Sequence, residues 1–290
     1  MKMLCLGAAA AALLAAQLAT AATPPAVVEA VQMPAWVERG SERIPLAPGM
    51  ALQDRDQLRT GVNSKLLLKM AEGSLVRLGE NGTLKLDRMG QGRDNVFSAA
   101  LNVFEGAFRF TTVALRAQRR RNINITIATV TAGIRGTDVW GKAASDKDIV
   151  CLIEGKIEVQ RGQDQPILMD QPLSFYIAPR GAPPLPVAPV DPEQLRVWSG
   201  ETQIAPGSGA AYRGGKWKVI AASVETQEEA LKLYDALRAA GYAAEIRPEM
   251  PAEKRIYIVR LAHLPSKAEA ETLARSIRGK MGVVEPRISM

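Results

Sequence analysis

The stretch "WKVIAASVETQEEALKLYDALRAAG", residues 217–241, decides the fold of the C-terminal part of this 290-residue chain. A second copy of its pattern, "YIVRLAHLPSKAEAETLARSIRGKM", follows about forty positions later at residues 257–281. At this offset identical residues coincide, among them Val219 with Val259, Glu229 with Glu269, and Leu233 with Leu273. The repetition indicates an internal duplication, in which each copy is an apolar strand followed by an amphipathic helix.

Both predicted helices begin with the same capping signal. Thr226 lies three residues before Glu229, and Ser266 lies three residues before Glu269. In such a capping box the hydroxyl accepts a hydrogen bond from a free backbone N–H, and the glutamate accepts one from the capping residue. Apolar residues then recur at helical spacing, so each helix has one face to bury.

A sheet supplies the surface that these helices need. We expect strands at residues 217–223, 243–247, 255–261 and 283–287. The resulting order βαββαβ predicts an α+β, split βαβ (ferredoxin-like) unit, with two helices on one face of four antiparallel strands. Alternation along the strands leaves the other face uncovered. The side chains expected on this uncovered face are Lys218, Ile220, Ala222, Ile258 and Arg260.

The segments "VETQEEALKLYDALRAAGY" and "YIVRLAHLPSKAEA" resemble a SPOR (sporulation-related repeat) domain over residues 214–290. Members of that family are envelope modules that bind peptidoglycan, notably glycan strands without stem peptides, and they often collect at the division septum. The resemblance implies a glycan site on the uncovered face, where we expect Arg260 to be the main polar contact. The chain departs from the family pattern at Ile220, where glutamine is usual, and at residues 262–264, which replace Gly-Pro-Phe.

The N-terminus predicts export. Residues 1–21 contain one early cation, Lys2, then an apolar stretch and an Ala-x-Ala sequence, which is typical of a cleavable secretory signal peptide. An uncleaved anchor is the alternative, and the alanine-rich run is a poor membrane span. Cleavage removes Cys5, so Cys151 remains as a single, structural thiol. We therefore expect a periplasmic or cell-envelope protein with no transmembrane segment after signal cleavage.

Residues 22–178 are expected to form an all-β domain, because short strands alternate with turn residues and long helical periodicity is absent. The dipeptide Asn81-Gly82 predicts a tight hairpin between strands at residues 75–78 and 83–86, since both residue types tolerate positive φ angles. Many short strands of this kind are typical of a sandwich or a barrel.

Within this domain, "EGAFRF", "TAGIRGTDVWGK" and "CLIEGKIEV" are similar to the FecR-like domain, over residues 54–159. The resemblance implies a jelly-roll-like β-sandwich that acts as a protein-interaction or sensing module for an unknown envelope protein. We interpret Gly136 as a glycine that permits a bend and Arg135 as a surface residue. The family's cytoplasmic anti-sigma segment and membrane helix have no counterpart in front of the β region, so we do not expect transmembrane signalling.

Residues 179–213 are rich in proline and glycine and predict a linker between the β domain and the SPOR-like domain. Trp198 is the bulkiest residue of this linker. Since a tryptophan seldom faces solvent, we expect it to dock onto the β domain.

The sequence offers no enzyme chemistry. His263 is the single histidine, and nucleophile elbows, phosphate-binding loops and cysteine pairs are missing, so we predict a non-enzyme without metal or cofactor. The net charge of +7 is spread along the chain, and its densest run, at residues 116–121, is interpreted as a solvated loop rather than a nucleic-acid site. The leading hypothesis is a peptidoglycan-binding envelope protein. The alternatives are a protein–protein scaffold without glycan binding and an accessory of a wall hydrolase.

Overall fold

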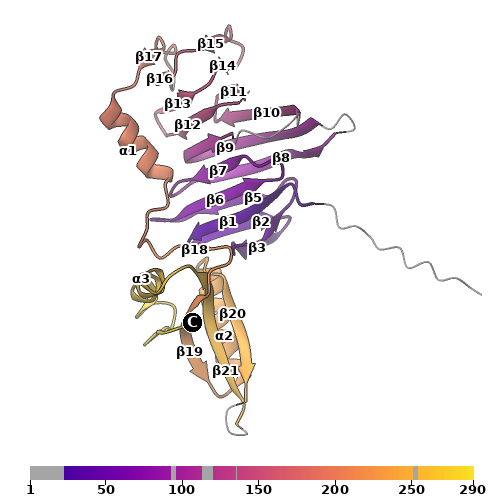
Figure 1. Cartoon of the computed structure of the whole chain (residues 1–290), viewed down its shortest axis with the longest axis vertical. Coiled ribbons are helices and arrows are strands. Elements are labelled where there is room, and N and C mark those ends of the chain that lie inside the picture. Colours follow the sequence, from indigo (N-terminus) through magenta and orange to yellow (C-terminus); the bar gives the residue numbers. More distant parts are fainter. Residues whose placement is uncertain (1–22, 93–95, 113–119, 135, 251–253) are drawn as a thin grey trace, which may run out of the picture.

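Two β-sheets packed face to face form the larger part of the molecule, and a small α/β unit lies at one end of them (Figure 1). The structure is a computed structural model that describes residues 23–92, 96–112, 120–134, 136–250 and 254–290. The predicted signal peptide, most of the arginine run at 116–121, and Arg135 lie outside the described residues. None of the helices in the described part is long and apolar enough to cross a bilayer.

One sheet of the β domain pairs its strands in the order β18-β1-β6-β7-β9-β12-β13-β16-β17, with β4 also against β1. These strands are β1 (Ala26–Gln32), β4 (Ala51–Leu52), β6 (Lys65–Met70), β7 (Leu75–Leu78), β9 (Val96–Thr111), β12 (Asp138–Ala143), β13 (Lys147–Glu154), β16 (Ser174–Pro179), β17 (Ala188–Pro189) and β18 (Ala211–Tyr212).

The second sheet has the order β3-β2-β5-β8-β9-β10-β11-β14-β15. Its further strands are β2 (Ala35–Arg39), β3 (Glu42–Pro45), β5 (Gln57–Thr60), β8 (Thr83–Gln91), β10 (Arg120–Ile127), β11 (Val130–Ile134), β14 (Ile157–Arg161) and β15 (Ile167–Met169). The long strand β9 belongs to both sheets and passes from one to the other near Gly106, whose φ of +85° suits glycine.

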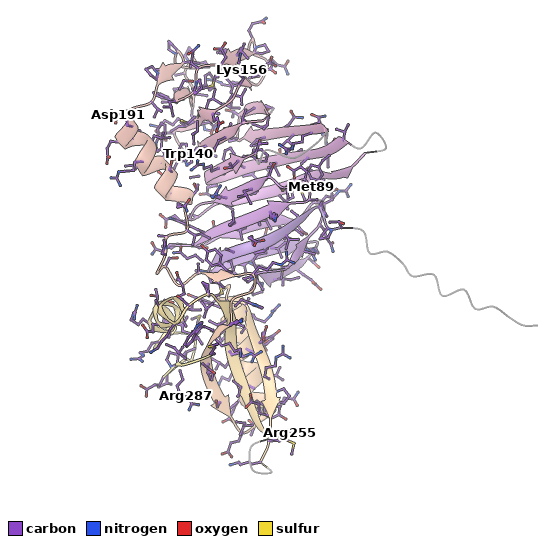
Figure 2. All side chains as sticks on the ribbon, in the orientation of Figure 1. Met89, Trp140, Lys156, Asp191, Arg255 and Arg287 are labelled. Atoms are coloured by element: carbon purple, nitrogen blue, oxygen red, sulfur yellow. The ribbon has the colours of Figure 1, made fainter. Side chains whose placement is uncertain are left out.

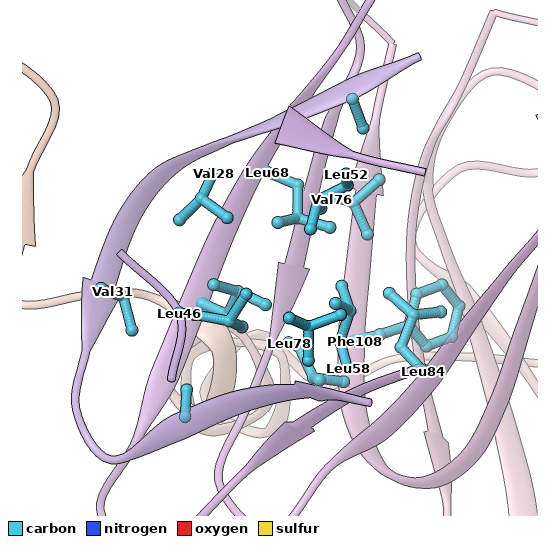
Figure 3. Packing of buried hydrophobic residues seen from close by; sticks show 14 of the residues in the cluster. Val28, Val31, Leu46, Leu52, Leu58, Leu68, Val76, Leu78, Leu84 and Phe108 are labelled. Atoms are coloured by element: carbon cyan, nitrogen blue, oxygen red, sulfur yellow. The ribbon is translucent and has the colours of Figure 1, made fainter. Parts of the chain in front are cut away.

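Apolar side chains fill the space between the two sheets. Leu68 and Phe108 from the first sheet and Leu58 and Leu84 from the second are fully or almost fully buried (Figure 3). Every second residue along these strands points inward, so the alternation in the sequence produces the core directly. The prediction of an all-β domain is confirmed.

The hairpin predicted at Asn81-Gly82 is wrong, although both of its strands exist. β7 pairs with β6 and β9, whereas β8 pairs with β5 and β9, so the connection crosses from one sheet to the other. Asn81 has the expected positive φ, +50°, and the Thr60 N–H donates to the Gly82 carbonyl at 3.0 Å. The turn signal is therefore real, but a strand's apolar face does not specify which neighbour it pairs with.

Residues 179–213 do not form a free tether. β17 and β18 extend the first sheet at its two ends, and α1 (Pro192–Thr202) packs beside it (Figure 1). The Trp198 ring stacks on buried Trp140 with centroids 4.8 Å apart and planes 5° from parallel. This confirms the predicted docking of Trp198 and makes the linker part of the β domain's surface.

Two further expectations for the β domain hold. Cys151 is fully buried, and burial raises the pKa of its thiol to about 12, so it is a structural thiol. Gly136 has a φ of +68°, which is a conformation that glycine adopts freely.

The C-terminal unit has the element order expected for the duplication. Its elements are β19 (Trp217–Val224), α2 (Gln227–Ala239), β20 (Ala244–Glu249), β21 (Ile256–Leu264), α3 (Lys267–Ile277) and β22 (Arg287–Ser289). The four strands pair antiparallel in the order β20-β21-β19-β22. Leu237 and Ile277 of the helices share a buried core with Val259 of the sheet, so both helices cover the same face. The last strand begins at Arg287 rather than at residue 283, because its pairing with β19 starts there, and Val283 instead packs in the core before the strand.

Candidate functional site

The uncovered face of the small sheet carries a row of side chains that spans all four strands. Arg260 of β21 lies opposite Glu245 of β20 on one side and Ile220 of β19 on the other. Ile220 in turn lies opposite Arg287 of β22. Residues paired in this way point to the same face, so the row places one apolar group, Ile220, between the guanidinium groups of Arg260 and Arg287. Ile258, two residues before Arg260, is on the same face beside Arg247.

Four of the five predicted site residues, Lys218, Ile220, Ile258 and Arg260, are half-buried on or at the edge of this face. Ala222 differs from the expectation. The pairing register shifts between Ile220 and Ala222, so Ala222 lies opposite buried Val259 and packs against the core. A β-bulge inserts one residue and reverses the alternation beyond it.

Arg260 is not a free cation. Its Nε and Nη2 atoms donate to Glu245 Oε2 at 3.2 and 3.1 Å. The same oxygen lies 3.6 Å from Arg247 Nε, so one carboxylate orients two guanidinium groups. A guanidinium has five N–H donors, and the remaining donors of Arg260 stay available to a ligand. Pairs at this level of exposure contribute little stability, which favours a positioning role for Glu245.

A hollow of about 610 Å³ lies at the edge of this face. Its lining includes four cationic side chains, Lys216, Lys218, Arg247 and Arg260, and one carboxylate, Glu245. His263, in a turn-like conformation with φ +67°, lies at the same hollow. The excess of cations makes this edge attractive to an anionic group.

Sequence reasoning missed Glu245, Arg247 and Arg287. Alternation within the second predicted strand, residues 243–247, would have placed Glu245 and Arg247 on one face. Which face that is depends on the register between β20 and β21, where Glu245 pairs with Arg260, and the sequence does not show that register.

A larger hollow lies elsewhere, between α1 and the β domain, and has a volume of about 1190 Å³. Its charged groups hold α1 in place. Lys65 Nζ donates to the carbonyls of Gly200 and Gln203 at 2.7 Å each, and Lys142 Nζ lies 2.9 Å from Glu201 Oε2. Burial lowers the pKa of Lys65. These contacts account for Lys65 and Lys142, and the third cation of the lining, Arg59, lies 2.9 Å from Glu38, so all three have protein partners.

The described residues contain no group of three or more His, Cys, Asp or Glu side chains that could hold a metal ion. The uncovered face presents isoleucines, guanidinium groups and ammonium groups. It can therefore bind a ligand that combines flat apolar surfaces with anionic or hydroxyl groups.

Comparison with known proteins finds two family domains in the chain. Residues 214–285 match the SPOR domain, and residues 56–158 match the FecR protein family. No curated protein matches the chain. Two crystal structures of a candidate anti-sigma factor from Parabacteroides distasonis ATCC 8503, at 2.50 and 1.65 Å resolution, are similar to it. Each has 15% sequence identity and a TM-score of 0.40, and the match covers 76% of this chain and 89% of the other.

Proposed function

We propose that this chain, which carries a FecR domain at residues 56–158 and a C-terminal SPOR domain at residues 214–285, is a non-enzymatic periplasmic protein of the cell envelope. Its SPOR domain binds the glycan strands of peptidoglycan through the uncovered sheet face. Its β domain contacts a second envelope protein and acts as an interaction or sensing module.

The observation that carries this proposal is that three cations, Arg247, Arg260 and Arg287, lie beside Ile220 and Ile258 on the uncovered face. Sugar rings have apolar faces that can lie on the isoleucines, and their hydroxyl groups accept hydrogen bonds from Arg260. Glycan strands without stem peptides also carry a free carboxylate on every second sugar. The cations at the edge hollow suit that carboxylate.

Co-sedimentation of the full chain with purified sacculi tests the proposal. We expect a larger bound fraction after the sacculi are treated with an amidase, because the treatment exposes the carboxylates. Binding should fall as salt rises, since the Debye length shortens from ~10 Å at 0.1 M to ~3 Å at 1 M. Sedimentation that is equal with and without sacculi would contradict glycan binding and favour the protein–protein scaffold.

A matched pair of charge reversals sharpens this test. Lys218→Glu changes a cation at the edge hollow, whereas Lys156→Glu makes the same change at the far end of the β domain (Figure 2). Both variants have the same net charge. We expect Lys218→Glu to lose most of the bound fraction and Lys156→Glu to retain it, because the effect is local to the uncovered face.

The far end of the β domain supports the second part of the proposal. β15 and β17 lie at the end opposite the SPOR domain (Figure 1). Exposed apolar side chains occur in β15 and in the segments just before β16 and β17, namely Ile167, Leu168, Leu173, Leu185 and Val187. Exposed apolar surface is typical of protein contact sites, so this end is the proposed place for the partner.

The proposed location requires export. The signal pattern at residues 1–21 leads us to expect an envelope-fraction chain that begins at Ala22, about 2 kDa lighter than the precursor. Intact-mass measurement checks this expectation. A chain that retains Met1 would contradict cleavage of the signal peptide.

A further inference from the structure

A buried carboxylate lies where the SPOR domain meets the β domain. Glu269, in the first turn of α3, is 6% exposed. Its Oε1 accepts a hydrogen bond from the Gly207 N–H at 2.6 Å, and its Oε2 accepts from the N–H groups of Gly209 and Ala210. One side chain of the SPOR domain thus satisfies three backbone donors of the segment that precedes it.

That segment belongs structurally to the β domain. Ala210 is fully buried against Ala30 of β1 and Ile204. Directly after it, β18 pairs with β1, with Tyr212 opposite Ala30. Burial raises the pKa of Tyr212, and the negative charge of Glu269 raises it further, as expected for groups that lie close together. Glu269 therefore connects α3 to the edge of the first sheet.

A second contact joins the other helix to the other sheet. Gly241, directly beyond α2, accepts a hydrogen bond at its carbonyl from the Ala35 N–H of β2 at 3.2 Å. The approach is so close that a Cβ atom on Gly241 would lie 2.5 Å from the Trp36 ring. Only glycine fits there, and its φ of +86° also favours glycine.

These two contacts lie on different helices and reach different sheets of the β domain. A single covalent connection leaves a domain free to rotate, whereas two separated attachments fix its orientation. We propose that the Glu269 carboxylate and the Gly241–Trp36 contact clamp the SPOR domain onto the β domain as one rigid body. The uncovered sheet face then has a fixed direction relative to the far end of the β domain, around β15. A chain bound by its SPOR face would hold that end at a set distance from its anchor.

The internal duplication supplies matched controls. Glu229 occupies the position in α2 that Glu269 has in α3, but it is exposed, and its carboxylate accepts a hydrogen bond from the Thr226 hydroxyl at 2.9 Å. Gly279 follows α3 as Gly241 follows α2, with a φ of +73°. A Cβ atom there would meet nothing within 4 Å. Each junction residue thus has a counterpart with the same local role and no contact across the junction.

A distance measurement between the two ends tests the clamp. Spin labels attached to Leu168→Cys and Val284→Cys, both at exposed positions, report the β15 end and the SPOR domain of the full two-domain chain. We expect one narrow distance distribution. Glu269→Gln sets an amide N–H₂ group against backbone donors. We expect Glu269→Gln and Gly241→Ala each to cause the loss of this single narrow distribution. Glu229→Gln and Gly279→Ala should preserve it.

A broad distribution in the chain without junction substitutions would overturn the proposal, and so would equal broadening by the control variants. Circular dichroism establishes that each variant remains folded. If Glu269→Gln does not fold, Gly241→Ala decides the question through the second contact. The measurement involves no glycan, so its outcome is independent of whether the SPOR face binds peptidoglycan.

Discussion

The first and second copies of the SPOR repeat share a local pattern and differ in what surrounds it. Thr226 and Ser266 accept a hydrogen bond from the N–H groups of Glu229 and Glu269, both at 3.2 Å. The two capping boxes are alike to this point. Beyond it, one glutamate faces solvent and the other is buried against the β domain. A local sequence signal therefore predicts the local cap, while the further partners of the same side chain depend on contacts that are distant in sequence.

The same contrast occurs on the uncovered face. Ile220 in β19 and Arg260 in β21 are equivalent residues of the two copies, and they lie directly opposite each other on the central strands. One copy thus supplies an apolar surface and the other a guanidinium group at the point where the copies meet. We expect the asymmetry to decide how glycan binds there.

The largest expected difference between the copies is in stability. Glu269→Ala leaves three backbone N–H groups without their acceptor, and two of them, on Gly209 and Ala210, are buried. Each unsatisfied buried donor costs about 1–3 kcal/mol, so we expect the free energy of unfolding of the full chain to fall by at least ~2 kcal/mol. Glu229→Ala removes only an exposed contact and should cost below about 1 kcal/mol. Denaturation in urea measures both, and equal losses would show that the Glu269 contacts are not formed.

The second difference concerns binding. Arg260→Ala removes a charged hydrogen-bond donor from the uncovered face, and such a bond contributes about 1.5 kcal/mol or more. We expect binding to amidase-treated sacculi to weaken roughly tenfold. Arg238→Ala removes the same charge from α2, where Arg238 lies over the Tyr234 ring on the helix side. It should leave the bound fraction nearly unchanged, and an equal loss in both variants would point to net charge instead of the face.

Much of this molecule follows from patterns that act over a few residues. The repeats, the helix N-caps Thr226 and Ser266, the inward-pointing residues of the β strands and the docking of Trp198 depend on spacing and side-chain size, which the sequence displays. The other half of each predicted capping box differs, because Glu229 accepts from the Thr226 hydroxyl and Glu269 accepts from the segment at residues 207–210. The strands at residues 75–78 and 83–86 were predictable for the same reason. Their pairing was not, since β7 and β8 find their partners in different sheets.

The candidate site was predictable to the extent that strand alternation held. It placed Ile220 and Arg260 correctly on one face, and it failed at Ala222, where the bulge between Ile220 and Ala222 leaves no mark in the sequence. The partners of Glu269 were hidden for another reason. They are backbone N–H groups of Gly207, Gly209 and Ala210, about sixty residues away, and a backbone donor carries no side-chain signature.

The smallest expected effect concerns Ile220, where related SPOR domains usually have glutamine. Ile220→Gln would place an amide between Arg260 and Arg287 in the row across the sheet. Its carbonyl can accept from a neighbouring guanidinium while its N–H₂ donates to a sugar hydroxyl. A net hydrogen bond contributes about 1 kcal/mol, so we expect binding of the full chain to amidase-treated sacculi to tighten roughly fivefold.

Ile220→Leu is the control for this last change, because it keeps an apolar side chain of the same size and adds no hydrogen-bonding group. We expect it to bind as the unaltered chain does, so that any gain in Ile220→Gln belongs to the amide. Ile220→Gln also makes the first copy polar at the position where the second copy has Arg260. It therefore tests whether the asymmetry between Ile220 and Arg260 limits the affinity for glycan. If neither Ile220→Gln nor Arg260→Ala changes the bound fraction, the point where the two copies meet is not the glycan contact. The uncovered face would then serve to dock a protein.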